Sequence, residues 1–182
     1  MRFFFHNEIF FNIKIFLGDI MEFENKLRDF IETKCEDYFL GTVDLSNAEN
    51  SITGKYSALL KEYPQAISIG VTIPPIILNE SKYNVNAINN VYITVHHILK
   101  SITSYLSNLL EHEGYNALAV PTTKGIMDKT YVSFHEIVAN LANMGKFEKN
   151  YLVTPQVGSR VNWGTVLTNA PLNFVKNEIK VD

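Results

Sequence analysis

The residues with the most evident chemistry lie between Tyr151 and Thr168. Gly158, Ser159 and Arg160 follow one another at a predicted tight turn, where exposed backbone amides, a hydroxyl and a guanidinium would meet. Such a group suits an anionic or amide-rich edge of a cofactor. Gly164, in the strand that follows, would allow a backbone or a flat ligand to approach closely. An ordinary hairpin with a solvated arginine explains the same residues, and both interpretations remain open.

Other reactive side chains give weaker indications. His96 and His97 are neighbours in a predicted helix, where adjacent side chains point about 100° apart, so they cannot readily chelate one metal ion. No metal site is predicted. Cys35 has Lys34 on one side but two acidic residues on the other, so a small buried apolar side chain is favoured over a reactive thiolate.

The composition restricts the possible functions. A chain of 182 residues with 46% hydrophobic and 19% charged residues is typical of one folded domain, with at most an appendage. The net charge of −3 argues against a general nucleic-acid binder. One cysteine excludes an internal disulfide and an iron–sulfur cluster ligated by this chain alone, so any redox chemistry needs a bound cofactor or a partner. Walker, Rossmann, nucleophile-elbow and HExxH motifs are absent.

The N-terminal residues 1–20 are apolar but interrupted. His6, Glu8 and Lys14 break the run, so no stretch reaches the ~18 residues of a membrane span, and a signal peptide is not evident. We expect an extension that is not native to the domain or is an appended strand, with a membrane or partner anchor as the alternative. A single domain is then predicted for 21–182, in the cytoplasm.

Periodicity and turn residues predict an α+β domain with a mostly antiparallel sheet. The expected helices cover 22–35, 56–62, about 86–112 and 133–142, the last opened by a capping box at Ser133 to Glu136. The expected strands are 40–45, 66–73, 115–120, 150–154 and 161–168, with a turn at 155–160 between the last two.

Several segments, in order, resemble one family. These segments are Ala66–Val71, Leu110–Ala117 with Val120-Pro121, Asn143–Asn150, Leu152–Pro155, Gly158–Arg160 and Thr165–Leu172. Together they resemble the cobalamin-binding N-terminal domain of epoxyqueuosine reductase and its archaeal or anaerobe relatives, kin to reductive dehalogenases. The resemblance runs from about residue 22 to 172. It implies a nitroreductase-like sandwich in which a long helix packs on the sheet.

The resemblance also implies a site. It assigns cofactor contacts, with cobalamin as the cofactor and FMN as the alternative, to Gly158, Ser159, Arg160, Val161, Gly164, Thr165 and Thr168. It places His135, Tyr131 and Asp128 near the reactive face. His135 stands where the epoxyqueuosine enzymes have a glutamate and where archaeal relatives often have a histidine. The aspartate of those enzymes aligns with Lys129, one residue from Asp128.

The sequence departs from the family in three places. Asn143 and Glu148 replace family glycines, which predicts a looser approach of backbone to cofactor. The family continues beyond Leu172 into two cysteine-rich motifs, and this sequence does not, so no iron–sulfur cluster is expected on this chain.

Three functions remain open. The first is a stand-alone corrinoid-binding redox domain reduced by a separate iron–sulfur protein. The second is an FMN-dependent nitroreductase-like oxidoreductase, and the third is a non-catalytic binding or assembly derivative. A nucleic-acid substrate is disfavoured, no membrane partner is expected, and a homodimer is an open alternative.

Overall fold

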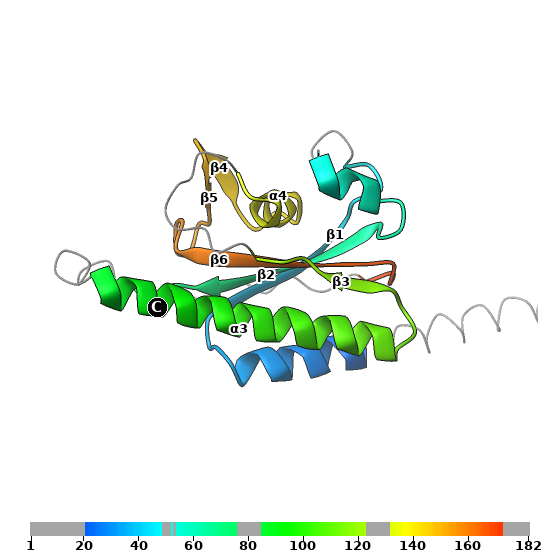
Figure 1. Ribbon diagram of the computed structural model, residues 1–182, viewed down its shortest axis with the longest axis horizontal. Coiled ribbons are helices and arrows are strands. Elements are labelled where there is room, and N and C mark those ends of the chain that lie inside the picture. Colours follow the sequence, from blue (N-terminus) through cyan, green and yellow to red (C-terminus); the bar gives the residue numbers. More distant parts are fainter. Residues whose placement is uncertain (1–20, 49–51, 53, 76–84, 123–131, 173–182) are drawn as a thin grey trace, which may run out of the picture. The chain divides into compact units, whose positions relative to one another are not determined.

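The computed structural model describes residues 21–48, 52, 54–75, 85–122 and 132–172 (Figure 1). The chain divides into two compact units, residues 1–34 and 35–182. In the first unit residues 21–32 are helical, which confirms the helix expected from 22, although it ends three residues early. Phe23, Leu27 and Ile31 are buried and recur every four residues, so they share one face of this helix. That one domain spans 21–182 stays a prediction.

The second unit contains a four-stranded sheet in which every neighbouring pair is antiparallel. Its order is β1 (Tyr38–Asp44), β2 (Gln65–Thr72), β6 (Val161–Thr168) and β3 (Ala117–Ala119). The two central strands, β2 and β6, are buried along most of their length, as expected of strands covered on both faces, and β2 alternates small and β-branched residues. The predicted antiparallel α+β fold is confirmed.

Helices cover both faces of this sheet (Figure 1). On one face lies α3 (Val85–His112), which packs against β6, β3 and β2 and confirms the predicted long helix. On the other face lies α4 (Phe134–Leu141), which packs against β6, β2 and β1. The predicted capping box opens α4: the amide of Glu136 donates to the Ser133 hydroxyl, and the Ser133 amide donates to the Glu136 carboxylate at 3.1 Å.

One local prediction is wrong, and another differs in its bounds and in the type of helix. The strands on either side of the turn at 155–160 do not form a hairpin. Instead β5 (Tyr151–Val153) pairs with β4 (Lys146–Glu148), an unpredicted strand, in a separate two-stranded sheet. Lys149 makes this possible because it adopts a positive φ of 56° in the short connection between them. The helix expected at 56–62 is a 3-10 helix, η1 (Gly54–Leu59).

Candidate functional site

The turn that carries Gly158 and Ser159 is closed by its own hydrogen bonds. The amides of Thr154 and Gly158 donate to each other's carbonyl oxygens at 2.9 and 3.0 Å. The Thr154 hydroxyl accepts from the Val157 amide and donates to the Gly158 carbonyl. Gly158 has a φ of +65°, which a residue with a side chain adopts only with strain. The turn therefore uses most of its own polar groups, and Ser159 is its exposed hydroxyl.

Arg160 is bound to the end of β2. Its Nη1 donates to the carbonyl oxygen of Ile73 at 3.0 Å, and the Ile73 amide donates to the carbonyl of Arg160 at 2.9 Å. The arginine is half-buried, so it is not the fully solvated side chain of a simple hairpin. A guanidinium has five N–H donors, and this bond occupies one of them.

Gly164 does provide a close approach, but to the protein's own helix. A Cβ placed on Gly164 would lie 3.0 Å from side-chain atoms of Leu99 and 3.1 Å from the Thr103 methyl group, both on α3. Successive residues of a strand point to opposite faces, so Thr168 shares this face of the sheet. The Thr168 hydroxyl is buried, donates to the Asn116 carbonyl at 2.8 Å and accepts from the Ala170 amide.

Thr165 lies on the opposite face, beneath α4, together with His135. Both side chains are buried, and the imidazole Nδ1 lies 3.0 Å from the Thr165 hydroxyl. The imidazole Nε2 lies 3.4 Å from the carbonyl oxygen of Pro121. A carbonyl only accepts, so Nε2 carries the proton of the neutral ring, and the Thr165 hydroxyl donates to Nδ1.

A polar row separates two apolar clusters on this face. In the β2–β6 register, Ser68 stands opposite Thr165, and both are completely buried. Ala66 and Leu167 belong to the cluster at one end of the row. Trp163 belongs to the cluster at the other end. The Ser68 hydroxyl has no hydrogen-bond partner among the residues that the structure describes.

Burial controls the charge of His135. Desolvation lowers the pKa of the imidazole to about 4, outweighing the opposing effects of the Pro121 carbonyl and the Glu136 carboxylate. His135 is therefore neutral near pH 7. In this form it cannot release a proton as an imidazolium would, but it can hold one on Nε2 and accept one at Nδ1.

The candidate cofactor residues are not gathered on one surface. Val161 and Thr165 face α4, whereas Gly164 and Thr168 face α3. A strand of eight residues is about 26 Å long, so Val161 and Thr168 lie at opposite ends of β6. Gly158, Ser159 and Arg160 are close only to the Val161 end. Tyr131 and Asp128 lie outside the described residues, and the roles of all these residues stay predictions.

Sequence reasoning missed the partners that hold these side chains. The carbonyls of Ile73 and Pro121 give no sequence signal, because their role depends on which chain segment lies opposite. Ser68 did give a sequence signal. It is a polar residue within the apolar run Ala66–Val71, and it shares one side of the strand with the small residues Ala66 and Gly70. That pattern predicts a polar position buried under a covering element.

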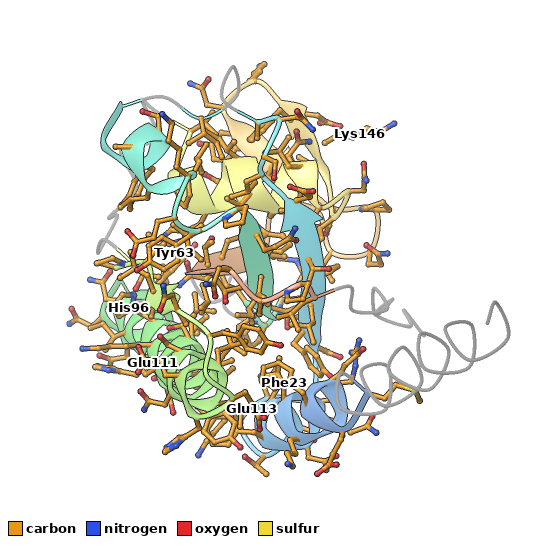
Figure 2. The ribbon with its side chains drawn as sticks, turned by 90° about the vertical axis from the view of Figure 1, so that its right-hand side faces the viewer. Phe23, Tyr63, His96, Glu111, Glu113 and Lys146 are labelled. Atoms are coloured by element: carbon orange, nitrogen blue, oxygen red, sulfur yellow. The ribbon has the colours of Figure 1, made fainter. Side chains whose placement is uncertain are left out.

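A hollow in the surface lies elsewhere. It has a volume of about 380 Å³ and is lined by Glu62, Tyr63, Glu111 and residues 114–117. Figure 2 shows Tyr63 and Glu111 on the same side of the molecule. Burial raises the pKa of the Tyr63 phenol, and the carboxylates of Glu62 and Glu111 add to the effect. In the part of the chain that the structure describes, no three metal-binding side chains cluster, here or elsewhere.

Comparison with known proteins finds solved structures of the same architecture. No protein-family model matches the sequence, and no curated protein matches it. An antiparallel sheet between helices, with α4 on one face and α3 on the other, is an α+β fold shared with solved structures. Those structures are of epoxyqueuosine reductase, and the similarity is to its N-terminal domain.

Three of these structures match nearly the same share of this chain. A selenomethionine-labelled epoxyqueuosine reductase is 15% identical with a TM-score of 0.52, and covers 87% of this chain and 49% of its own. The enzyme with an epoxyqueuosine-modified tRNA-Tyr stem loop is 15% identical with a TM-score of 0.50, covering 87% and 48%. The Bacillus subtilis enzyme, with its catalytic loop swung out of the active site, is 16% identical with a TM-score of 0.53, covering 88% and 49%. The chain thus spans about half the length of these proteins, and the likeness establishes the fold.

None of the helices in the described segments is both long enough and apolar enough to cross a membrane.

Proposed function

We propose that this chain is a redox domain that binds a corrinoid and receives electrons from an iron–sulfur site on another protein. The observation that carries the proposal is the fold, which follows epoxyqueuosine reductase over 87% of this chain. The family motifs quoted from the sequence add support, since they occur in the same order. One thiolate cannot hold a cluster, so the ligands of an iron–sulfur site would have to come from outside these 182 residues.

The residues at the start of β6 fit a polar cofactor edge in part. The Ser159 hydroxyl is exposed, and the Arg160 guanidinium keeps donors beyond the one used by Ile73. These groups would bind and orient amide or phosphate groups at the edge of a ring. A bound corrinoid would supply the metal-centred electron transfer that the protein's own side chains lack. His135 would contribute a neutral imidazole whose proton is held at Nε2.

A second candidate function is a binding or assembly domain without a cofactor. The specific observation in its favour is that three of the candidate cofactor residues, all on β6, are already engaged inside the fold. Thr165 pairs with His135, Thr168 pairs with Asn116, and the space over Gly164 is taken by α3. A domain that kept the architecture but lost the pocket would show this arrangement.

Absorption spectroscopy separates the two functions. Protein purified under anaerobic conditions is brought to equilibrium by dialysis against a concentration series of hydroxocobalamin or FMN, and the excess ligand retained with the protein is measured. Retained corrinoid bands, with a dissociation constant below about 1 mM, support the redox domain. Retained flavin bands would redirect the proposal to an FMN oxidoreductase, and retention of neither ligand supports the binding domain.

Matched variants locate the cofactor. Arg160→Lys should weaken binding about tenfold, or about 1.4 kcal/mol, because lysine lacks the planar fork of donors. Lys146→Ala, in the exposed part of β4, is the control and should bind as the unmodified chain does. Binding that is unchanged in Arg160→Lys would place the cofactor away from this turn.

A further inference from the structure

The outer edge of β3 presents main-chain groups that no neighbouring strand uses. β3 is the last strand in the sheet order, so only its β6 side is paired. The Val120 amide donates to the Thr165 carbonyl at 2.9 Å, and the Asn116 carbonyl accepts from the chain just beyond β6. In an antiparallel ladder every second residue points its main-chain groups at the partner strand, and the residues in between point away. Ala117 and Ala119 therefore direct their N–H and C=O groups outward, and the described residues form no hydrogen bond with them there.

This unpaired stretch is short and has a defined end. Pro121 is the next residue that points outward, but it has no N–H, and its carbonyl accepts from His135 Nε2 at 3.4 Å. The open edge of β3 is therefore the segment Ala117–Ala119, with two outward donors and two outward acceptors. An edge of this length is a poor template for aggregation, but it can pair with a short extended segment.

An acidic hollow adjoins the start of the open edge. Ala117 itself lines the hollow of about 380 Å³, together with Glu62, Tyr63 and Glu111. Both carboxylates add to the effect of burial in raising the pKa of the Tyr63 phenol, so their negative charge acts within the hollow. Among the described residues that line it, there is no lysine, arginine or histidine. A cationic group is the electrostatic complement of this surface.

The register decides which residue of an added strand would reach the hollow. Ala117 stands opposite Thr168 and therefore shares the α3 face of the sheet with it. A residue paired opposite Ala117 on the open side would point to the same face, where Glu111 of α3 lies. A second copy of β3, paired antiparallel about Leu118, would place only the methyl group of Ala119 there.

We propose that the open edge and the hollow together bind an extended segment of a partner protein, which adds a strand antiparallel to β3 and places a lysine or arginine opposite Ala117. Main-chain hydrogen bonds would hold the segment, and the basic side chain would select it. This surface lies at the Thr168 end of β6, whereas the Arg160 turn lies at the Val161 end. The inference therefore does not require that a cofactor binds, and either proposal can fail without the other.

Amide hydrogen exchange of the unmodified chain, measured by NMR in dilute solution, tests the open edge. The Ala117 and Ala119 amides should exchange at least about tenfold faster than those of Leu118 and Val120, which face β6. Equal protection of all four amides would mean that the edge is already covered, and it would overturn the proposal. Protection that appears only as the chain concentration rises would identify a second copy as the occupant and would also overturn it.

A synthetic peptide, acetyl-Ser-Thr-Val-Lys-Thr-amide, is the probe for binding. Paired antiparallel to β3, it places its valine opposite Leu118 and its lysine opposite Ala117. An NMR titration should shift the amide signals of Ala117 and Ala119. A peptide with glutamate in place of lysine should bind about tenfold more weakly, because like charges would then meet at the hollow.

A second control peptide tests the main-chain bonds. Methylation of the amide nitrogens of its first threonine and its lysine keeps every side chain but removes the two donors that face β3. The methylated peptide should bind at least about tenfold more weakly. No shift with the unmethylated lysine peptide, or equal binding of either control peptide, overturns the proposal.

Variants of the chain separate the edge from the hollow. Ala119→Pro removes an outward N–H and should weaken peptide binding about tenfold, whereas Ala119→Ser keeps the N–H and should bind as the unmodified chain does. Glu111→Gln should reduce the preference for lysine over glutamate, and Glu113→Gln, an exposed carboxylate outside the hollow, should not. Unchanged binding in Ala119→Pro, or an unchanged preference in Glu111→Gln, overturns the proposal. If Ala119→Pro does not fold, the methylated peptide decides the role of the edge.

Discussion

Ile73 and Arg160 are joined by two hydrogen bonds that run in opposite directions. The Ile73 amide donates to the Arg160 main chain, and the Arg160 side chain donates back to the Ile73 carbonyl. The pair therefore extends the β2–β6 ladder beyond its last register pair, Thr72 with Val161. The Arg160 side chain thus provides a hydrogen bond where a further main-chain bond would otherwise form.

Replacing this arginine should weaken the fold as well as any cofactor site. Arg160→Met keeps the length of the side chain but leaves the buried Ile73 carbonyl without its donor, which should lower the free energy of unfolding by about 1–2 kcal/mol. Urea denaturation measures the change. The exposed neighbour provides the control, because Ser159→Ala should stay within about 0.5 kcal/mol. Equal stabilities for the two variants would contradict the role of the pair.

Gly164 tests the packing of α3 on the sheet. Gly164→Ala places a methyl group 3.0 Å from Leu99 atoms, so the free energy of unfolding should fall by about 1–3 kcal/mol. Shortening the opposing side chain should relieve the clash, and the Gly164→Ala, Leu99→Val double variant should lose less than the sum of the single variants. Additive losses in this double-mutant cycle would show that the two residues are not in contact.

A charge beneath α3 should be far more damaging than one on its surface. Val95 is 5% exposed, so Val95→Asp buries an unpaired carboxylate and should cost at least about 3 kcal/mol. Ile93 lies two residues earlier and is 47% exposed, and Ile93→Asp should be almost neutral. Thermal unfolding followed by circular dichroism compares them. A stable Val95→Asp protein would mean that this face of the helix is not buried.

The stability of the whole domain should depend on pH through His135. Its pKa is about 4 in the folded protein and about 6.5 when exposed, so the unfolded chain binds the proton more readily. The free energy of unfolding should therefore have its highest value above pH 6.5 and fall by about 3 kcal/mol as the pH drops to 4. Urea titrations across this range measure it. His135→Gln should reduce the fall, and an identical fall in that variant would assign it to other groups.

The elements predicted correctly are those whose signals are local. Alternation marks β2, helical spacing and Gly114 delimit α3, and Ser133 with Glu136 opens α4. The pairing of β4 with β5 is also local, across Lys149 and Asn150, but it has a weak signal. The positive φ of this turn falls on a lysine, whereas the usual signal of a two-residue hairpin is a glycine.

The residues of the candidate site also divide into those with a local sequence signal and those without one. The sequence pointed to Arg160 and His135, but the groups they bind are the main-chain carbonyls of Ile73 and Pro121. These are 87 and 14 residues away along the chain, and any residue type provides a carbonyl. The faces of β6 are a local property, because the alternation of a strand by itself places Gly164 and Thr165 on opposite sides.

The length of α3 has a consequence for how the domain loosens. Its 28 residues extend about 42 Å, well beyond the roughly 26 Å of the strands beneath it. The first buried side chain described along it is Val95, and the turns before that residue include Asn86, Asn89 and Asn90, which are weak helix formers. None of the side chains described in those turns is buried, whereas Val95, Leu99 and Ile102 are. Unwinding on heating should therefore begin at this end of α3 and stop near Val95, so that one continuous helix melts in two stages.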